Sequence, residues 1–271
     1  MMPDQAQNDD AAPPHIDIDV VETVAVATLV NPARRNAISH GMWRELEAFA
    51  ADVNADPDIR VVVFRGQGSV FSAGADISDF QEDRAGSDGA RAYDDQLERT
   101  CLALEAIRQP TVARLEGPVV GAGAALAACC DLRIASDDAF FMVPAARLGL
   151  GYDPRGIARL ARTFGDATAR WLMLTAGRLP ASRAFANGAV HEVVEAVELD
   201  GAVGRLASRL MENAPLTIAA AKMSLRAFAD GAEPTLMDEA WHLTDLADAS
   251  EDYEEGRRAF AQKRTPRFQG V

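Results

Sequence analysis

The sequence predicts an α/β protein whose last third is helical. Between residues 16 and 135, apolar runs of strand length alternate with helical periodicity in the order strand, helix, strand, helix, strand. From residue 196 onward only helical periodicity is found. Hydrophobic residues make up 48% and charged residues 25% of the 271 positions, which is the composition of an ordinary globular protein.

Side-chain spacing indicates the first elements. Apolar and acidic residues alternate from residue 16, which is typical of strands over residues 16–30. Ser39 is a suitable N-cap, and apolar side chains from Trp43 to Val53 recur at helical spacing, so a helix is predicted there. The β-branched run over residues 59–64 predicts a strand covered on both faces.

The next elements follow a polar segment. Residues 81–92 carry Gln, Glu, Asp, Gly and Ser, and we expect them to form a mobile surface loop. A helix is predicted over residues 91–108, and short apolar runs predict strands over residues 111–115 and 132–135. Parallel strands joined by helices require right-handed crossovers.

The chain divides into three parts by composition. Residues 1–14 are rich in Asp, Pro and Gln and are expected to form a disordered tail. Residues 15–195 form the predicted α/β core, and residues 196–271 form a helical C-terminal region. No Gly/Ser linker separates these two parts, so the helical region is expected to pack on the core or on a neighbouring subunit.

Charge and cysteine content exclude several classes of protein. The net charge of −14 and a pI near 4.7 argue against binding to nucleic acid or to anionic membranes. Three cysteines (Cys101, Cys129 and Cys130) are too few for a disulfide framework, which favours a reducing compartment. No signal peptide or membrane-spanning stretch is recognised, so we expect a cytoplasmic protein without a membrane partner.

Two small-residue motifs could supply backbone hydrogen-bond donors. Residues 71–77 (FSAGADI) follow the strand over 59–64, and residues 117–126 (GPVVGAGAAL) follow the strand over 111–115. Each motif alone also fits a tight turn or close helix packing, with Asp76 as a cap in the first. The second lacks the last glycine of a dinucleotide fingerprint, because Leu126 stands there. Together, two N–H groups can converge on one carbonyl oxygen and stabilise an enolate or tetrahedral intermediate.

These motifs belong to a longer ordered set of stretches, which are residues 31–37, 71–76, 116–123, 130–135, 174–178, 189–194, 250–256 and 263–268. Through these stretches the chain resembles the enoyl-CoA hydratase/isomerase (crotonase) superfamily from about residue 16 to its end. The resemblance implies a crotonase-like spiral core of ββα units with a C-terminal helical trimerisation region, assembled as a homotrimer or dimer of trimers. It also implies an acyl-CoA thioester substrate, with no metal and no cofactor beyond the coenzyme A of the substrate.

The resemblance assigns roles by position. The backbone N–H groups of Ala75 and Ala122 would form an oxyanion hole. A second group of positions would bind the coenzyme A part of the substrate. For Arg34 and Arg35 the alternative interpretation is that they are ordinary solvent-exposed charges. The coenzyme A positions are Ala73 and Ala75 at the adenine, Arg34 and Arg35 at the phosphates, and Phe260 and Lys263 from the C-terminal region, often of a neighbouring subunit.

The chain departs from hydratases at both catalytic carboxylates. Hydratases of this family use two opposed glutamates, one to activate water and one to protonate the α-carbon. The corresponding positions here are Ala125 and Ala145. Alanine cannot transfer a proton, so two-glutamate hydration is not expected.

The remaining candidates are Asp153 and Tyr152. An acidic residue at the position of Asp153 resembles the base of dienoyl-CoA isomerases, the nucleophile of aryl-CoA dehalogenases and an acid of 3-hydroxyacyl-CoA hydrolases. Tyr152 resembles a tyrosine of the methylmalonyl-CoA decarboxylase branch. The alternative for Asp153 is the N-cap of a helix that begins at Pro154.

We therefore expect an acyl-CoA enzyme with isomerase or lyase chemistry. Asp153 would be the general base or nucleophile, and Tyr152 a hydrogen-bond donor or proton relay. Two alternatives remain open: a non-catalytic acyl-CoA-binding protein, and an acyl-CoA hydrolase or decarboxylase.

Overall fold

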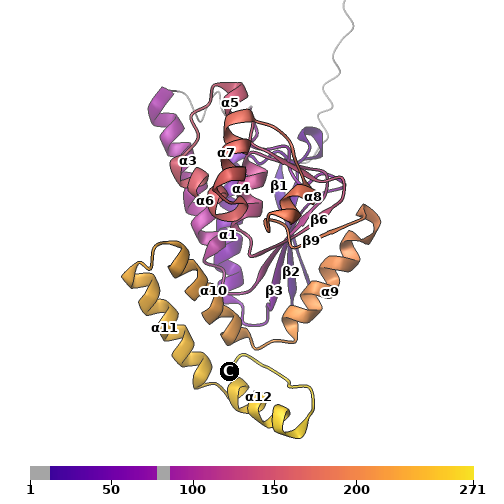
Figure 1. Cartoon of the computed structure of the whole chain (residues 1–271), viewed down its shortest axis with the longest axis vertical. Coiled ribbons are helices and arrows are strands. Elements are labelled where there is room, and N and C mark those ends of the chain that lie inside the picture. The colour runs from indigo at the N-terminus through magenta and orange to yellow at the C-terminus, as the bar shows by residue number, and fades with distance from the viewer. Residues whose placement is uncertain (1–12, 78–85) are drawn as a thin grey trace, which may run out of the picture.

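A six-stranded sheet forms the centre of the computed structural model, which describes residues 13–77 and 86–271 (Figure 1). The strand order is β1-β2-β3-β4-β6-β9, in which β1 is antiparallel to β2 and every other neighbouring pair is parallel. The strands are β1 (His15–Val21), β2 (Val24–Val30), β3 (Val61–Gly66), β4 (Thr111–Leu115), β6 (Leu132–Ser136) and β9 (Glu192–Val194).

A second, three-stranded sheet contains β5 (Pro118–Val120), β7 (Phe140–Met142) and β8 (Leu179–Pro180). Strand β7 lies between the other two, parallel to β5 and antiparallel to β8. Alternate side chains along these strands point to opposite faces. One face is completely buried, and its side chains are Val119, Phe141 and Leu179.

The helices connect the strands and extend the C-terminal half. The helices of more than eight residues are α1 (His40–Ala55), α3 (Gly86–Glu105), α6 (Pro154–Phe164), α7 (Asp166–Thr175), α9 (Leu199–Met211), α10 (Pro215–Ala229), α11 (Pro234–Asp248) and α12 (Glu251–Gln262). The shorter ones are α4 (Ala122–Cys129), α5 (Ala145–Leu148), α8 (Ala181–Ala186) and the 3-10 turns η1 (Pro32–Arg34) and η2 (Ala196–Glu198).

Strand β3 is buried on both faces, as its β-branched run predicts. Val61 and Val63 pack in a cluster with Leu199 of α9. Val62 and Phe64 belong to the larger core cluster, which includes the apolar face of α1. Figure 1 shows α9 and α1 on opposite sides of the sheet. The α/β class is thereby confirmed.

The C-terminal helices extend beyond the body of the molecule. Helices α10 and α11 pack along each other, while α11 and α12 project below the sheet in Figure 1. Large apolar side chains on α10 and α11 remain exposed, with Leu225 73%, Phe228 80% and Trp241 63% accessible. The expected trimeric assembly stays a prediction. None of the helices in the described ranges is long and apolar enough to cross a membrane.

The predicted elements agree with the structure except around α3. Ser39 caps α1 by accepting the Met42 N–H, as expected. The loop expected over 81–92 is wrong for residues 86–92, which form the first turns of α3. Helix α3 can form there because Tyr93, Leu97 and Leu104 lie at helical spacing and cover the core. Residues 81–85 and residues 1–12 of the expected tail lie outside the described residues.

Candidate active site

An apolar cavity of about 150 Å³ lies where the loop after β3 meets α3, α4 and the α5–α6 connection. The residues of its wall include Ala75, Ala122, Leu97, Val143 and Leu150. Both small-residue motifs found in the sequence therefore reach the same cavity.

Ala75 is oriented by a parallel bridge to Ile38. The Ile38 N–H donates to the Gly74 carbonyl (2.7 Å), and the Asp76 N–H donates to the Ile38 carbonyl (2.9 Å). In such a bridge the N–H of the residue between these two bonds faces the other side. The Ala75 N–H consequently has no protein acceptor among the described residues and lies at the cavity wall. Gly74 adopts φ 115°, which requires glycine.

Ala122 is the first residue of α4, so its N–H is not used by the helix. The preceding Gly121 N–H donates to the Met142 carbonyl (2.8 Å), which fixes the start of the helix. Gly123 permits close packing against the first motif, because a Cβ there would lie 2.7 Å from the Ser72 Cβ. This packing holds the N-terminus of α4 beside the loop that carries Ala75.

Asp153 has two structural roles at this site. It is the N-cap of α6 and accepts the Arg155 N–H at 2.8 Å, which confirms the helix-cap interpretation. Its carboxylate also lines the cavity, and its side chain is only 12% exposed. Partial burial acts to raise the pKa of Asp153, but the hydrogen bonds and charge of Arg155 outweigh it and hold the pKa below its ordinary value. The carboxylate is therefore ionised at neutral pH. Its catalytic role stays a prediction.

Tyr152 also lines the cavity, next to Asp153. Burial raises the pKa of its phenol far above the ordinary value, so the hydroxyl stays protonated. The ring packs on Gly156, where a Cβ would lie 2.9 Å from a ring carbon. A neutral phenol in this position can donate a hydrogen bond but cannot serve as a base.

Two further polar residues of the wall were not singled out in the sequence. Tyr93 and Asp94 on α3 line the cavity, and Tyr93 is 3% exposed. Both residues lie near the start of the helix predicted over residues 91–108. Helical spacing with Leu97 was the one sequence feature that could have placed them on the same side of that helix. No family motif marked them.

The two alanines at the expected glutamate positions are both buried. Ala145 lines the cavity and is 4% exposed, while Ala125 is 1% exposed within α4. Neither side chain carries a titratable group. Among the described wall residues, the carboxylates belong to Asp94 and Asp153.

The expected coenzyme A residues are only partly brought together. Ala73 lines the cavity, and its N–H donates to the Arg35 carbonyl at 2.9 Å. The Arg34 guanidinium forms an ion pair with the buried Asp76 and is half exposed. Phe260 is 88% exposed on α12, and neither it nor Lys263 lines the cavity within this chain.

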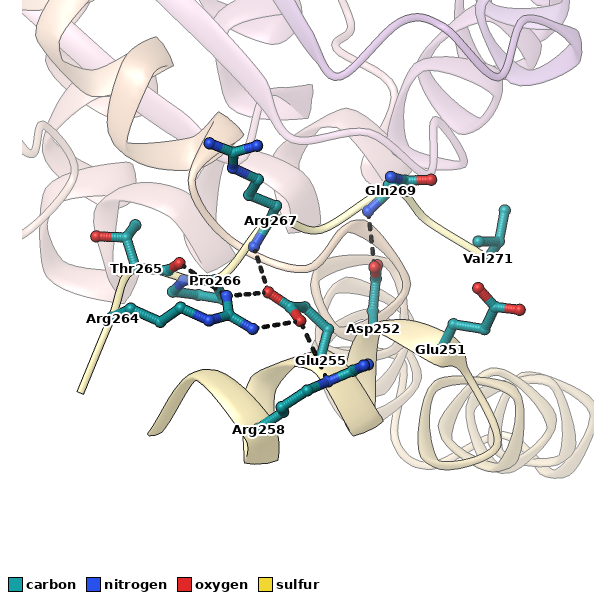
Figure 2. Close-up of a pocket in the computed structure, with 10 residues that line it drawn as sticks. All are labelled: Glu251, Asp252, Glu255, Arg258, Arg264, Thr265, Pro266, Arg267, Gln269 and Val271. Carbon is teal, nitrogen blue, oxygen red and sulfur yellow. Dashed lines mark hydrogen bonds and ion pairs between the residues drawn. The ribbon is translucent and has the colours of Figure 1, made fainter. Parts of the chain in front are cut away.

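Elsewhere, a larger open hollow of about 840 Å³ lies between α12 and the C-terminal segment (Figure 2). Two of its carboxylates, those of Glu255 and Asp252, already have partners. Glu255 accepts two hydrogen bonds from the Arg264 guanidinium (2.6 and 2.9 Å), and Asp252 accepts the N–H groups of Gln269 and Gly270. These contacts fasten the C-terminal segment to α12. In the described ranges, no cluster of three or more metal-ligating side chains occurs.

The chain is similar to proteins of one family along almost its whole length. Residues 19–271 match the family described as Enoyl-CoA hydratase/isomerase. A Mycobacterium leprae protein named "Probable enoyl-CoA hydratase echA6" is 35% identical, over 94% of this chain and its own full length. The methylmalonyl-CoA decarboxylase of Escherichia coli is 33% identical, over 94% of this chain and 98% of its own. The crystal structure of an enoyl-CoA hydratase/carnithine racemase from Magnetospirillum magneticum has a TM-score of 0.87 at 33% identity, covering 94% of this chain and 96% of that one.

Proposed function

Because this chain belongs to the enoyl-CoA hydratase/isomerase family, we propose that it binds an acyl-CoA thioester and stabilises its enolate. The observation that carries the proposal is the position of two backbone donors, the N–H groups of Ala75 and Ala122, at one apolar cavity. Preorganised donors in a site without bulk water stabilise developing negative charge on a carbonyl oxygen.

The proposed chemistry is that of an isomerase or a lyase. The thioester oxygen accepts both N–H groups, and the acyl chain lies against Leu97, Val143 and Leu150. Asp153 accepts a proton from one carbon of the acyl group and returns it to another, while the neutral Tyr152 hydroxyl donates a hydrogen bond. No cofactor is required, since the enolate forms on the substrate itself.

The environment of Asp153 limits how strong this base can be. Its lowered pKa gives the ionised form required of a base, but a carboxylate so well stabilised binds a proton weakly. Proton transfer therefore depends on strong acidification of the substrate by the two backbone donors. A decarboxylation needs no base at all, because loss of CO₂ leaves the enolate directly.

Hydration by two glutamates is not part of this proposal. With Ala125 and Ala145 at the positions that the family resemblance assigns to glutamates, the chain lacks the glutamate pair that would activate water and protonate the α-carbon. We propose that hydration of crotonyl-CoA is far slower here than in a two-glutamate enzyme. Efficient hydration would contradict this assignment.

A second candidate is acyl-CoA binding without turnover. The Arg155 guanidinium favours this candidate, because it already donates hydrogen bonds to both oxygens of the Asp153 carboxylate. In that case the cavity and the two donors would hold a thioester that the protein does not convert.

The experiment that separates the two candidates is turnover of a panel of acyl-CoA thioesters, followed by mass spectrometry. We expect conversion of at least one thioester, and its loss in Asp153→Asn. Asp95→Asn is the matched control, because Asp95 binds the same Arg155 guanidinium at 2.8 Å but does not line the cavity. Equal turnover in Asp153→Asn and wild type would contradict the assigned base, and binding without any conversion would favour the second candidate.

A further inference from the structure

A hollow of about 410 Å³ lies on the open face of the three-stranded sheet. Its floor consists of Pro118 and Val120 of β5 and Phe140 and Met142 of β7. These residues are paired across the two strands and alternate with the buried Val119 and Phe141, so they share one face. The sheet thus presents an organised surface there.

Two arginines from separate elements line this hollow. Arg35 follows the η1 turn, and Arg178 immediately precedes β8. The Arg178 Cζ lies 4.5 Å from the centroid of the Phe140 ring, so the guanidinium is stacked over the floor. Within the described ranges, neither arginine forms an ion pair, in contrast to Arg34, which is paired with Asp76.

One carboxylate also belongs to the wall. Asp138 accepts a hydrogen bond from the Ser136 hydroxyl, and within the part of the chain that the structure describes it forms no ion pair with Arg35 or Arg178. The charged side chains of the hollow therefore sum to one positive charge. In a chain with net charge −14, this positive balance is a local exception.

The hollow and the acyl cavity are neighbours along the backbone. Ala73 and Val120 line both of them. The Ala73 N–H donates to the Arg35 carbonyl at 2.9 Å, which fixes Arg35 relative to the cavity mouth. A single extended ligand can therefore place an acyl thioester in the cavity and an anionic end in the hollow.

We propose that Arg178, together with Arg35, binds a phosphate of the coenzyme A moiety in this hollow. This inference rests on the proposed acyl-CoA ligand. The family resemblance already places Arg35 at the phosphates, and the new assignment is the role of Arg178, to which that resemblance gives none. A guanidinium is planar, remains charged and offers paired N–H donors that match phosphate oxygens. Stacking on Phe140 holds its plane in place, so little side-chain freedom remains to be lost on binding.

The test is calorimetric measurement of the Kd for coenzyme A in wild type, Arg178→Ala and Arg183→Ala. Arg183 is the matched control, since it is also an exposed arginine stacked on an aromatic ring (5.3 Å from Trp171) but does not line the hollow. We expect Arg178→Ala to weaken binding by about tenfold or more, and Arg183→Ala to leave it unchanged. Thermal unfolding of both variants shows whether either substitution disturbs the fold.

The effect of Arg178→Ala on the binding of three ligands shows which phosphate group is bound. If coenzyme A and dephospho-coenzyme A are both weakened by Arg178→Ala, the pyrophosphate is bound. If only coenzyme A is weakened, the 3′-phosphate is bound. An acyl-pantetheine thioester, which has no phosphate, should bind equally to wild type and to the variant.

Two results overturn the inference while leaving acyl-CoA binding intact. They are an unchanged Kd in a folded Arg178→Ala variant, and an equal loss in Arg183→Ala, which would indicate a general effect of charge. If wild type binds neither coenzyme A nor any acyl-CoA, the proposed function itself fails.

Discussion

Asp153 and Arg155 form a closed pair at the start of α6. The Arg155 Nε lies 3.1 and 2.9 Å from the two carboxylate oxygens of Asp153, and Nη2 lies 2.7 Å from Oδ2. The same carboxylate caps the helix and lines the acyl cavity. One residue therefore links the stability of α6 to the chemistry assigned to the cavity.

This pair predicts a specific dependence of stability on pH. The folded-state pKa of Asp153 lies below its ordinary value of 3.8, so its contribution to stability is complete above about pH 4 and is lost as pH falls through the folded pKa. Asp153→Asn keeps a capping side chain but removes this titration. We expect the variant to lose about 0.2–1 kcal/mol at neutral pH, because Arg155 is half exposed.

The measurement is urea unfolding of wild type and Asp153→Asn between about pH 7 and pH 3. The difference in unfolding free energy should shrink below about pH 4. If the unfolding free energies of the two proteins changed in parallel across this pH range, the Asp153 carboxylate would have the same pKa in the folded and unfolded chain.

Gly123 should be sensitive to the smallest substitution. In Gly123→Ala the new methyl group would lie 2.7 Å from the Ser72 Cβ, so α4 must move away from the loop that carries Ala75. We expect a cost of about 1–3 kcal/mol in unfolding free energy and weaker acyl-CoA binding.

Gly204→Ala is the control for Gly123→Ala. Gly204 is an exposed glycine within α9, and a Cβ there would meet no atom within 4 Å in the described part of the chain. Its substitution should stabilise the protein by about 0.5–1 kcal/mol through helix propensity alone. If both substitutions had the same effect, close packing at Gly123 would not matter.

A buried ion network beneath the site gives a third prediction. Arg159 is 4% exposed, with Nη1 3.0 Å from Glu98 and Nε 2.8 Å from Glu105. Arg159→Met leaves the buried Glu98 carboxylate without a cation, while Glu105 keeps its ion pair with Arg162 (2.5 Å). Removing one partner of a buried pair typically costs about 3–5 kcal/mol. Arg170→Met breaks a solvent-exposed pair with Asp166 and should cost far less. The measurement is thermal unfolding of the Arg159→Met and Arg170→Met variants. Equal melting temperatures would contradict the conclusion that Arg159 forms a buried ion network.

The three thiols should be unreactive in the folded protein. Cys101, Cys129 and Cys130 are free and buried. Burial raises the pKa of Cys130 to about 12 and that of Cys129 well above its ordinary value, so little thiolate is present near neutral pH. Titration with a disulfide reagent should show no fast reaction before unfolding and three equivalents after it. A fast equivalent in the native protein would show an accessible thiol.

The sequence predicted the larger elements because each has a local signal. The Ser39 N-cap, the β-branched run of β3 and the helical spacing of α9 all depend on near neighbours. The three-stranded sheet was not predicted, because β8 has two residues and β5 and β7 have three each. Such short strands form through pairing between distant segments and carry no periodicity of their own.

The site was predictable to the extent that it is built from backbone. Ala75 and Ala122 lie in glycine-containing turns, which a sequence motif marks, and both reach the same cavity. The side chains around them were harder to foresee. Helix α3 brings Tyr93 to the cavity, and the small sheet brings Arg178 beside Phe140, through contacts that no local pattern encodes.

The central claim is that Ala75 and Ala122 polarise a thioester carbonyl, and infrared difference spectroscopy of a bound acyl-CoA labelled with ¹³C at that carbonyl tests it most directly. Two hydrogen bonds to the oxygen weaken the C=O bond, so the carbonyl stretch should move to a lower frequency on binding than in water. A bound thioester whose carbonyl frequency equals or exceeds its value in water would contradict the oxyanion hole and the function built on it.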